Sequence, residues 1–136
     1  MSKYSRLFTI TSLLYLLLAS LMGLTMATNP SMAGLLRFPH IHTMMIGWVS
    51  MMIFGLAYHV VPRFAGSPLI KDRWQGIHFW CANIALLGMI LTPQSSFVFF
   101  AVFGSLQGVG ILIFVFTMLR ALKFKMPSKP CCNSCQ

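Results

Sequence analysis

Residues 36–63 read LRFPHIHTMMIGWVSMMIFGLAYHVVPR. The run exceeds the length of about 20 mostly apolar residues that a helix needs to cross the hydrocarbon core of a bilayer. It places His40 and His42 at one end and His59 near the other. Because lipid cannot hydrate an imidazole, histidines in a membrane span usually face the interior of a helix bundle and serve a function. The stretch therefore predicts a membrane-spanning helix and the location of the functional site.

The composition extends this prediction to the whole chain. Of the 136 residues, 57% are hydrophobic and 8% are charged, whereas a soluble domain carries about 25% charged residues. We expect an all-α integral membrane protein, a four-transmembrane-helix bundle that forms one domain over residues 1–125, followed by a flexible tail over 126–136. A cleaved signal peptide is the alternative for the first apolar run. The longest outer connection is expected over residues 28–39. The predicted spans cover roughly residues 7–27, 40–62, 75–93 and 97–119.

Positive charges indicate how the bundle is oriented. The formal net charge is +9, and Asp72 is the only acidic residue. The basic residues precede the first span, separate the second from the third, or follow the fourth, and Arg37 alone lies on the other side. By the positive-inside rule, both termini are then cytoplasmic and His40 and His42 lie at the outer surface. We expect a bacterial inner (cytoplasmic) membrane protein in contact with the lipid bilayer, and no nucleic-acid partner.

Small residues follow one face of the second predicted span. Steps of 100° per residue bring Gly47, Met51, Gly55 and Tyr58 close to the face that carries His40. Such a face offers a ligand near its outer end and a shallow groove below it. A flat macrocycle is expected to lie there.

The four histidines suggest one or two haem sites. His40 and His42 lie about 200° apart around a regular helix, so we expect one to bind a haem while the other contacts a loop, a second metal or a neighbouring subunit. Pro39 suits the first position of a helix and would place His40 in a loose first turn and His42 one turn position deeper. His59 lies roughly 25 Å from His42 along the helix and cannot share its iron. His78 returns to the depth of His59, so these two either form a bis-histidine inner site or lie in an interfacial aromatic belt.

Other side chains argue for or against further chemistry. No predicted span contains a carboxylate, the usual proton carrier of membrane pumps, and no nucleophile–base set indicates hydrolysis. Cys132 and Cys135 have the spacing of a soft-metal chelate, with a mobile thiol tail as the alternative. Together with eleven methionines, they leave copper handling open. Gly104 and Gly108 are spaced for close helix packing.

Three motifs carry a family resemblance. The run Arg37-x-x-His40-x-His42 opens a helix that ends in Tyr58-x-Val60-Val61-Pro62-Arg63, and Phe79-Trp80-x-x-Asn83-Ile84 follows. Over about residues 35–92, the chain resembles the early helices of haem-copper oxidase subunit I, above all in the C-family oxidases and nitric oxide reductases. It is also similar to short four-helix relatives of that subunit and to haem- and copper-containing membrane proteins linked to the nitric oxide response.

The resemblance implies an axial haem ligand. It matches His40 to the histidine that binds the low-spin haem, because Arg37 precedes it by three residues, and a shift of two residues would select His42. The family's later metal ligands have no counterpart in these four helices. A complete terminal oxidase or nitric oxide reductase is therefore less expected than an electron-transfer cytochrome or subunit. The second axial ligand would come from another subunit or from one of these side chains: His42, Met22, Met26 or Met89.

The sequence thus predicts a membrane-embedded b-type haem protein that transfers electrons in a respiratory or quinol-linked chain. One or two haem b groups and a quinol or redox-partner protein are expected, in a homo-oligomer or as a subunit of a larger complex. The alternatives are a copper-handling or nitric oxide-responsive metal protein and a non-catalytic assembly subunit.

Overall fold

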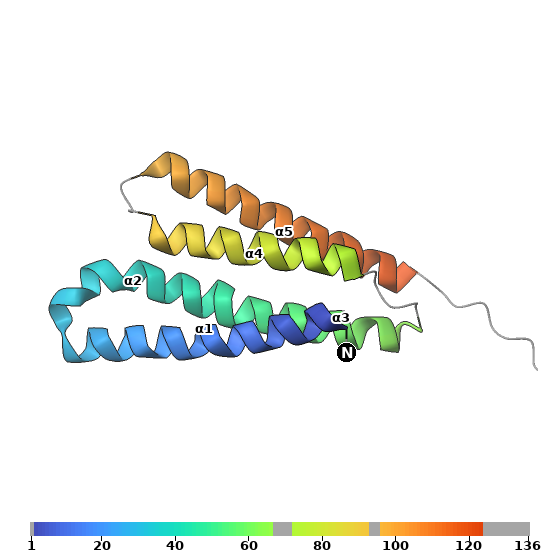
Figure 1. Ribbon diagram of the computed structural model, residues 1–136, viewed down its shortest axis with the longest axis horizontal. Helices are drawn as coiled ribbons and strands as arrows, with labels where there is room; N and C mark the ends of the chain where they lie inside the picture. The colour runs from blue at the N-terminus through green and yellow to red at the C-terminus, as the bar shows by residue number, and fades with distance from the viewer. Residues whose placement is uncertain (1, 67–71, 93–95, 124–136) are drawn as a thin grey trace, which may run out of the picture.

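The computed structural model describes residues 2–66, 72–92 and 96–123, and every regular element in these ranges is helical (Figure 1). The first span is α1 (Lys3–Thr28). The second is a continuous series of a 3₁₀ helix η1 (Pro30–Met32), α2 (Ala33–His42), a π-helix η2 (Thr43–Ser50) and α3 (Met51–Phe64). The third and fourth are α4 (Asp72–Leu91) and α5 (Phe97–Lys123).

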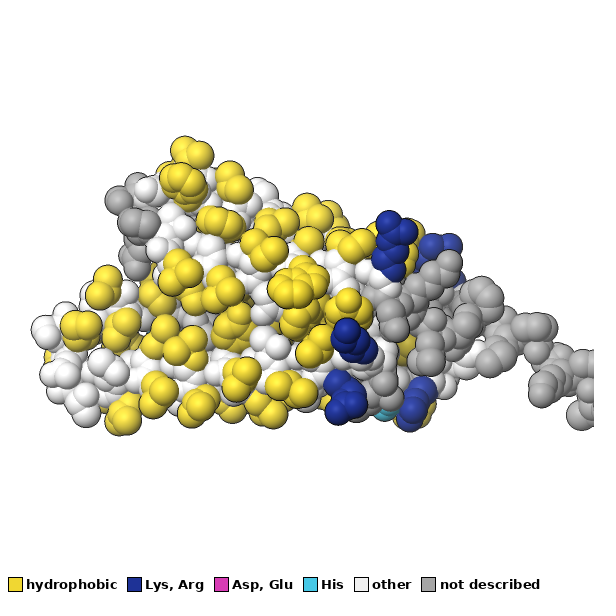
Figure 2. All heavy atoms as spheres, in the orientation of Figure 1, with side chains coloured by type: hydrophobic (Ala, Val, Ile, Leu, Met, Phe, Trp, Pro, Cys, Tyr) yellow, Lys and Arg dark blue, Asp and Glu magenta, His cyan; other side chains and the backbone are white. Residues whose placement is uncertain are grey.

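Four helices in the described part of the chain are long and apolar enough to cross a membrane. Their boundaries are Lys3–Thr28, Pro30–Phe64, Arg73–Leu91 and Phe97–Lys123. Apolar side chains cover much of the outward surface in Figure 2, as lipid contact requires. The prediction of an all-α protein with four such helices is confirmed.

The helices form two antiparallel pairs. Helix α1 packs along the second span, and α4 packs along α5 (Figure 1). Between the pairs, α4 contacts α1, α2 and η2, while α5 contacts α3. The turn between α1 and η1 lies at the same end as the last residues of α4 and the first of α5 (Figure 1). We call this the turn end of the bundle and the opposite end the N-terminal end.

The predicted outer loop over residues 28–39 is wrong, because the chain reverses at Asn29 alone. The backbone of Asn29 leaves the helical region, at φ −129° and ψ 86°, and its N–H donates to the Thr25 carbonyl over 2.9 Å. Pro30 then opens η1, where its fixed φ and missing N–H suit a first helical position. The helix-start signal expected at Pro39 therefore belongs to Pro30.

Pro39 instead lies inside α2, directly before the π-helix. His40 is the eighth residue of α2, about two turns beyond its start, rather than in a first turn. Proline has no N–H to offer within a helix. At the next junction, the Thr43 N–H bonds to the carbonyls of both Pro39 and His40. From there the backbone widens into the i→i+5 pattern of η2, a form that is found mostly as short insertions and often near functional sites.

Glycines allow the close approach of α1 to the second span. A Cβ at Gly47 would lie 2.8 Å from Cγ of Tyr15, and one at Gly55 would lie 2.7 Å from Oγ1 of Thr9. The Ser5 hydroxyl also donates to the Gly55 carbonyl over 2.7 Å. Small residues and hydrogen bonds between helices replace the hydrophobic effect in membranes. These contacts make α1 and the second span a single layer.

Positive charge collects at the N-terminal end. Lysine and arginine side chains group at that end in Figure 2, where α1 and α4 begin and α3 and α5 end (Figure 1). Arg37 lies on α2, at the turn end. The charge asymmetry expected from the sequence is thus present along the bundle. The residues that contribute to the charged end are Lys3, Arg6, Arg63, Arg73, Arg120 and Lys123.

Candidate functional site

His40 projects from α2 onto α1. Its Nδ1 lies 2.9 Å from the carbonyl oxygen of Ala19. A carbonyl only accepts hydrogen bonds, so Nδ1 must carry the proton, and a neutral His40 presents the lone pair of Nε2. The ring lies over Gly23, where an added Cβ would come within 3.2 Å of its Cε1. Two positions of α1 therefore fix the rotation and the tautomer of His40.

His42 is held in a similar way but by its own helix. Its Nδ1 lies 3.0 Å from the Phe38 carbonyl, which again leaves Nε2 as the unprotonated atom of a neutral ring. The Phe38 ring lies 4.0 Å from the imidazole between centroids, and the Phe100 ring of α5 lies 6.3 Å away. Two aromatic rings thus limit the movement of His42.

The structure directs the two histidines to different surroundings. His40 contacts α1, whereas His42 contacts Phe38 and, across the bundle, α5. This divergence agrees with the angle of about 200° that two helical residues of this spacing subtend. Each imidazole is suited to bind a metal through Nε2, because metal-bound histidines usually donate their other N–H to a carbonyl or carboxylate. Their geometry does not direct both at one iron.

The small-residue face predicted on the second span exists, but α1 covers its glycines, and α4 contacts it at Gly47 and Tyr58. Gly47, Met51, Gly55 and Tyr58 are all buried. Met51 is fully buried and belongs to the hydrophobic core of the bundle. For a haem to lie against this face, α1 would have to separate from the second span.

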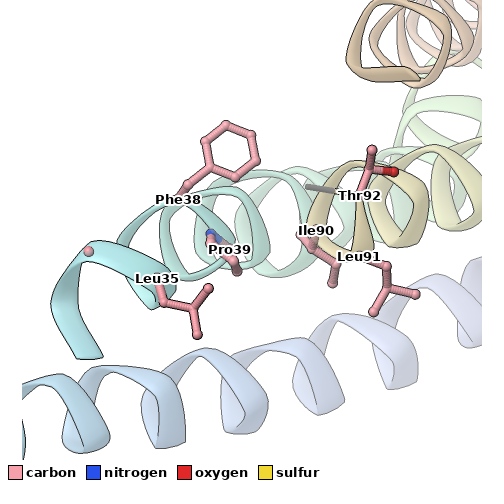
Figure 3. A pocket seen from close by; sticks show the side chains of 7 residues that line it. Leu35, Phe38, Pro39, Ile90, Leu91 and Thr92 are labelled. Carbon is pink, nitrogen blue, oxygen red and sulfur yellow. The ribbon is translucent and has the colours of Figure 1, made fainter. Parts of the chain in front are cut away.

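A cavity of about 490 Å³ opens at the turn end between α2 and α4. Figure 3 shows the side chains around it: Leu35, Phe38 and Pro39 from α2, Ile90 and Leu91 from α4, and Thr92 directly after α4. The volume is within the range of small-molecule pockets, about 300–1,000 Å³. No histidine lines the cavity. Phe38 lines it and also stacks on His42, so this side chain links the cavity to one of the histidines.

At the level of α3, the structure pairs His78 with Tyr58. The Tyr58 hydroxyl lies 2.9 Å from Nδ1 of His78, and both side chains are buried, with exposures of 1% and 0%. His59 is only half-buried, and it lies about 100° around the helix from Tyr58. No hydrogen bond or ring contact joins His59 to His78 among the described residues. The structure does not bring the predicted inner pair together.

The remaining predicted ligands are dispersed. Arg37 is exposed on α2, Met22 and Met26 are half-buried on α1, and Met89 is buried on α4. Cys132 and Cys135 lie outside the described residues. Among residues 2–66, 72–92 and 96–123, no group of three or more histidine, cysteine or acidic side chains gathers as a metal site would require.

Sequence reasoning missed the residues that orient the histidines. Ala19 and Gly23 supply the carbonyl and the space for His40, and their spacing of four residues is a small-x-x-x-small pattern on α1. That pattern was available as a signal. Phe100 gave no signal, since its contact with His42 depends on how α5 packs.

Comparisons with known proteins identify the segment that carries the histidines. Residues 36–96 match the family model described as cytochrome c and quinol oxidase polypeptide I. Over 96 residues, the chain is 32% identical to cytochrome c oxidase subunit 1 of Rhodobacter capsulatus, an alignment that covers 64% of the chain. The chain is thus similar to oxidase subunit I over part of its length, and its four candidate membrane spans make it an integral membrane protein.

The relationship has defined limits. The alignment covers 17% of the Rhodobacter subunit, and no solved structure matches the chain. The family match includes α2, η2, α3 and α4, and therefore all four histidines. Oxidases of this family bind haem and copper. The segment that matches the oxidase family model thus includes the helical residues from which His40 and His42 project.

Proposed function

We propose that this protein is a membrane-embedded b-type haem protein that transfers electrons, with a haem held near the turn end of the bundle by His40 or His42. The observation that carries the proposal is the state of these two imidazoles. Each is bonded through Nδ1 to a backbone carbonyl, and each lies within the segment that matches oxidase polypeptide I. A bound haem would supply reversible one-electron oxidation and reduction of its iron.

His40 is the first choice of ligand. The Ala19 carbonyl keeps the proton on Nδ1 and leaves Nε2 for iron, and Gly23 leaves space for the ring. His42 is the second choice, with Phe38 and Phe100 restricting its ring and excluding water from one side. The surrounding helices are apolar, which suits a porphyrin and favours a protected redox centre.

The wider context of the proposal follows from family and charge. A position in a respiratory complex fits the oxidase relationship, with a quinol or a redox protein as electron donor and with further copies or subunits in the assembly. The positive-inside rule places the charged N-terminal end, and with it both termini, in the cytoplasm. The haem would then lie toward the outer side of a bacterial inner membrane.

The test is an absorption spectrum of the purified full chain, expressed with ample haem supply. We expect a low-spin haem spectrum that sharpens on reduction with dithionite. His40→Ala should abolish it if His40 is the ligand, and His42→Ala should do so if His42 is. His59→Ala, at the N-terminal end, is the matched control and should retain the outer haem.

Two results would overturn the haem proposal. One is a colourless and iron-free wild-type preparation that is nevertheless folded. The other is an unchanged haem spectrum in the double variant His40→Ala/His42→Ala. Copper without iron in the metal analysis, lost when residues 130–136 are removed, would instead support the copper-handling alternative.

A further inference from the structure

An imidazole nitrogen and a cysteine border the same spot in the contact between α4 and α5. A Cβ added to Gly110 of α5 would lie 3.8 Å from Nε2 of His78 and 3.8 Å from Cβ of Cys81. These two atoms are therefore separated by no more than twice that distance. His78 and Cys81 are three residues apart on α4, a spacing that makes them neighbours on one helix face. The bare backbone of Gly110 leaves the spot between them without a side chain from α5.

The Nε2 atom of His78 is buried and has no hydrogen-bond partner among the described residues. The other sides of the ring are occupied. Its Nδ1 lies 2.9 Å from the Tyr58 hydroxyl, and the ring centroids of Phe54 and Phe8 lie 4.6 and 5.1 Å from its own. Buried polar groups in folded proteins nearly always have a partner, so Nε2 requires an explanation. The edge of the ring that carries it faces Gly110.

Cys81 supplies a second group at this spot. It is a free cysteine and is half-buried. Its sulfur lies one bond beyond Cβ and changes position by rotation about χ1. No hydrogen bond joins the thiol to Nε2 among the described residues. A metal ion between the two would hold them further apart than a hydrogen bond does, because metal bonds to histidine nitrogen and cysteine sulfur are each roughly 2.0–2.3 Å long.

The charge of the surroundings limits which ion can bind there. Asp72 is the only acidic residue of the chain. A divalent ion held by one thiolate would keep a net positive charge inside the apolar bundle, which is costly. A cuprous ion held by one thiolate and one neutral imidazole is a neutral unit.

The number and kind of ligands also favour the cuprous ion. Thiolate ligands select Cu(I), and imidazole binds copper well. Most metal ions require more ligands than a pair, and larger groups of histidine, cysteine or acidic side chains are absent from the described residues. Cu(I) accepts two ligands in a line, so one thiolate and one imidazole are sufficient.

We propose that Cys81 and His78 bind one cuprous ion at the contact of α4 with α5. The thiol releases its proton to solvent as the copper–sulfur bond forms, the lone pair of Nε2 makes the second bond, and copper remains Cu(I). Nδ1 then donates its proton to the Tyr58 oxygen, since metal-bound histidines usually donate through their other nitrogen. The site is separate from His40 and His42, so it stands whether or not the protein binds haem.

The test is an anaerobic titration of the purified full chain with cuprous ion, in competition with a colorimetric cuprous chelator. Cys131, Cys132 and Cys135 are first replaced by serine, so that the tail contributes no thiol. We expect one equivalent of bound copper in this background and none after the further substitution Cys81→Ala. X-ray absorption at the copper edge should show one sulfur and one nitrogen neighbour.

Tyr58→Phe tests the orientation of the imidazole. Loss of the hydroxyl that accepts from Nδ1 should weaken copper binding by about 10–100-fold. His59→Ala is the matched control, because His59 is the next residue of α3 and is half-buried, and it should leave the affinity unchanged. Circular dichroism checks that each variant is folded. Equal copper binding by the Cys81→Ala variant, a copper spectrum with sulfur neighbours alone, or no copper bound by the folded background protein would refute the proposal.

Discussion

Gly23 determines how closely the imidazole of His40 approaches α1. An added Cβ at this position would meet Cε1 of His40 at 3.2 Å, which is tighter than most carbon contacts in proteins. The Ala19 carbonyl holds the same ring from the other direction. One backbone carbonyl and one missing side chain therefore set the position of the proposed ligand.

Gly23→Ala should displace the His40 ring. Overpacking of this kind costs about 1–3 kcal/mol, which exceeds the gain of about 0.5–1 kcal/mol that alanine brings to a helix. We expect a lower melting temperature and, if His40 binds haem, a shifted or weakened low-spin spectrum.

Gly34→Ala is the matched control for this substitution. Gly34 is exposed on α2, and an added Cβ there would meet nothing within 4 Å. The control should be as stable as the wild type or more so, with an unchanged spectrum. Equal effects of the two substitutions would mean that Gly23 does not position His40.

Much of the histidine geometry could be predicted from residue spacing. Steps of 100° per residue gave the divergence of His40 and His42, and they placed Tyr58 on the buried face of the second span. For His78, the sequence left open either a pair with His59 or a place in an interfacial aromatic belt, and it did not predict the hydrogen bond to Tyr58. Tyr58 and His59 are neighbours in sequence, yet one faces the core and the other is half-buried. Helix periodicity already placed Tyr58 on the core face, and it therefore favoured Tyr58 as the partner of His78.

At the scale of elements, the second span combines three kinds of helix. Its start was predicted about ten residues too late, because Pro30 and Pro39 carry the same helix-start signal. The turn at Asn29 decides between them. The π-helix could not be predicted, since it arises from the way the backbone adapts after Pro39 rather than from a recognisable residue pattern.

Two pairs of glycines on different spans should respond oppositely to alanine. Gly47→Ala and Gly55→Ala place a methyl group within 2.8 Å of Tyr15 and 2.7 Å of Thr9, so each should destabilise the bundle by about 1–3 kcal/mol. At Gly104 and Gly108, an added Cβ meets nothing within 4 Å in this chain. Thermal unfolding in detergent measures the difference.

Gly104 and Gly108 serve as the control for the role of Gly47 and Gly55 in helix packing. Gly104→Ala and Gly108→Ala should leave the unfolding temperature of the monomer unchanged or raise it. If the substitutions at Gly104 and Gly108 destabilise the protein as much as those at Gly47 and Gly55, then Gly47 and Gly55 are not needed for the close packing of α1 against the second span.

At the scale of the whole molecule, the distribution of charge predicts the orientation in the membrane. The charged N-terminal end should face the cytoplasm. We expect Ser31→Cys, exposed on η1 at the turn end, to react with a membrane-impermeant maleimide in intact cells. Ser2→Cys should react only after permeabilisation. The four native cysteines are first replaced by serine or alanine.

The reverse labelling pattern would place the turn end, and with it His40 and His42, on the cytoplasmic side. Labelling of both positions in intact cells would instead indicate a mixed orientation. An intact-cell marker that reports leakage distinguishes this result from damaged membranes.

The reversal at a single residue, Asn29, bears on how the protein enters the membrane. Two helices joined so tightly have no length of chain with which to insert one at a time, and their backbone polar groups must all be satisfied within the lipid. The first two spans should therefore insert as one helical hairpin during synthesis. His40 would then arrive in the bilayer already beside Ala19 and Gly23, before α4 and α5 have left the ribosome, and any cofactor would meet a ligand that is oriented in advance.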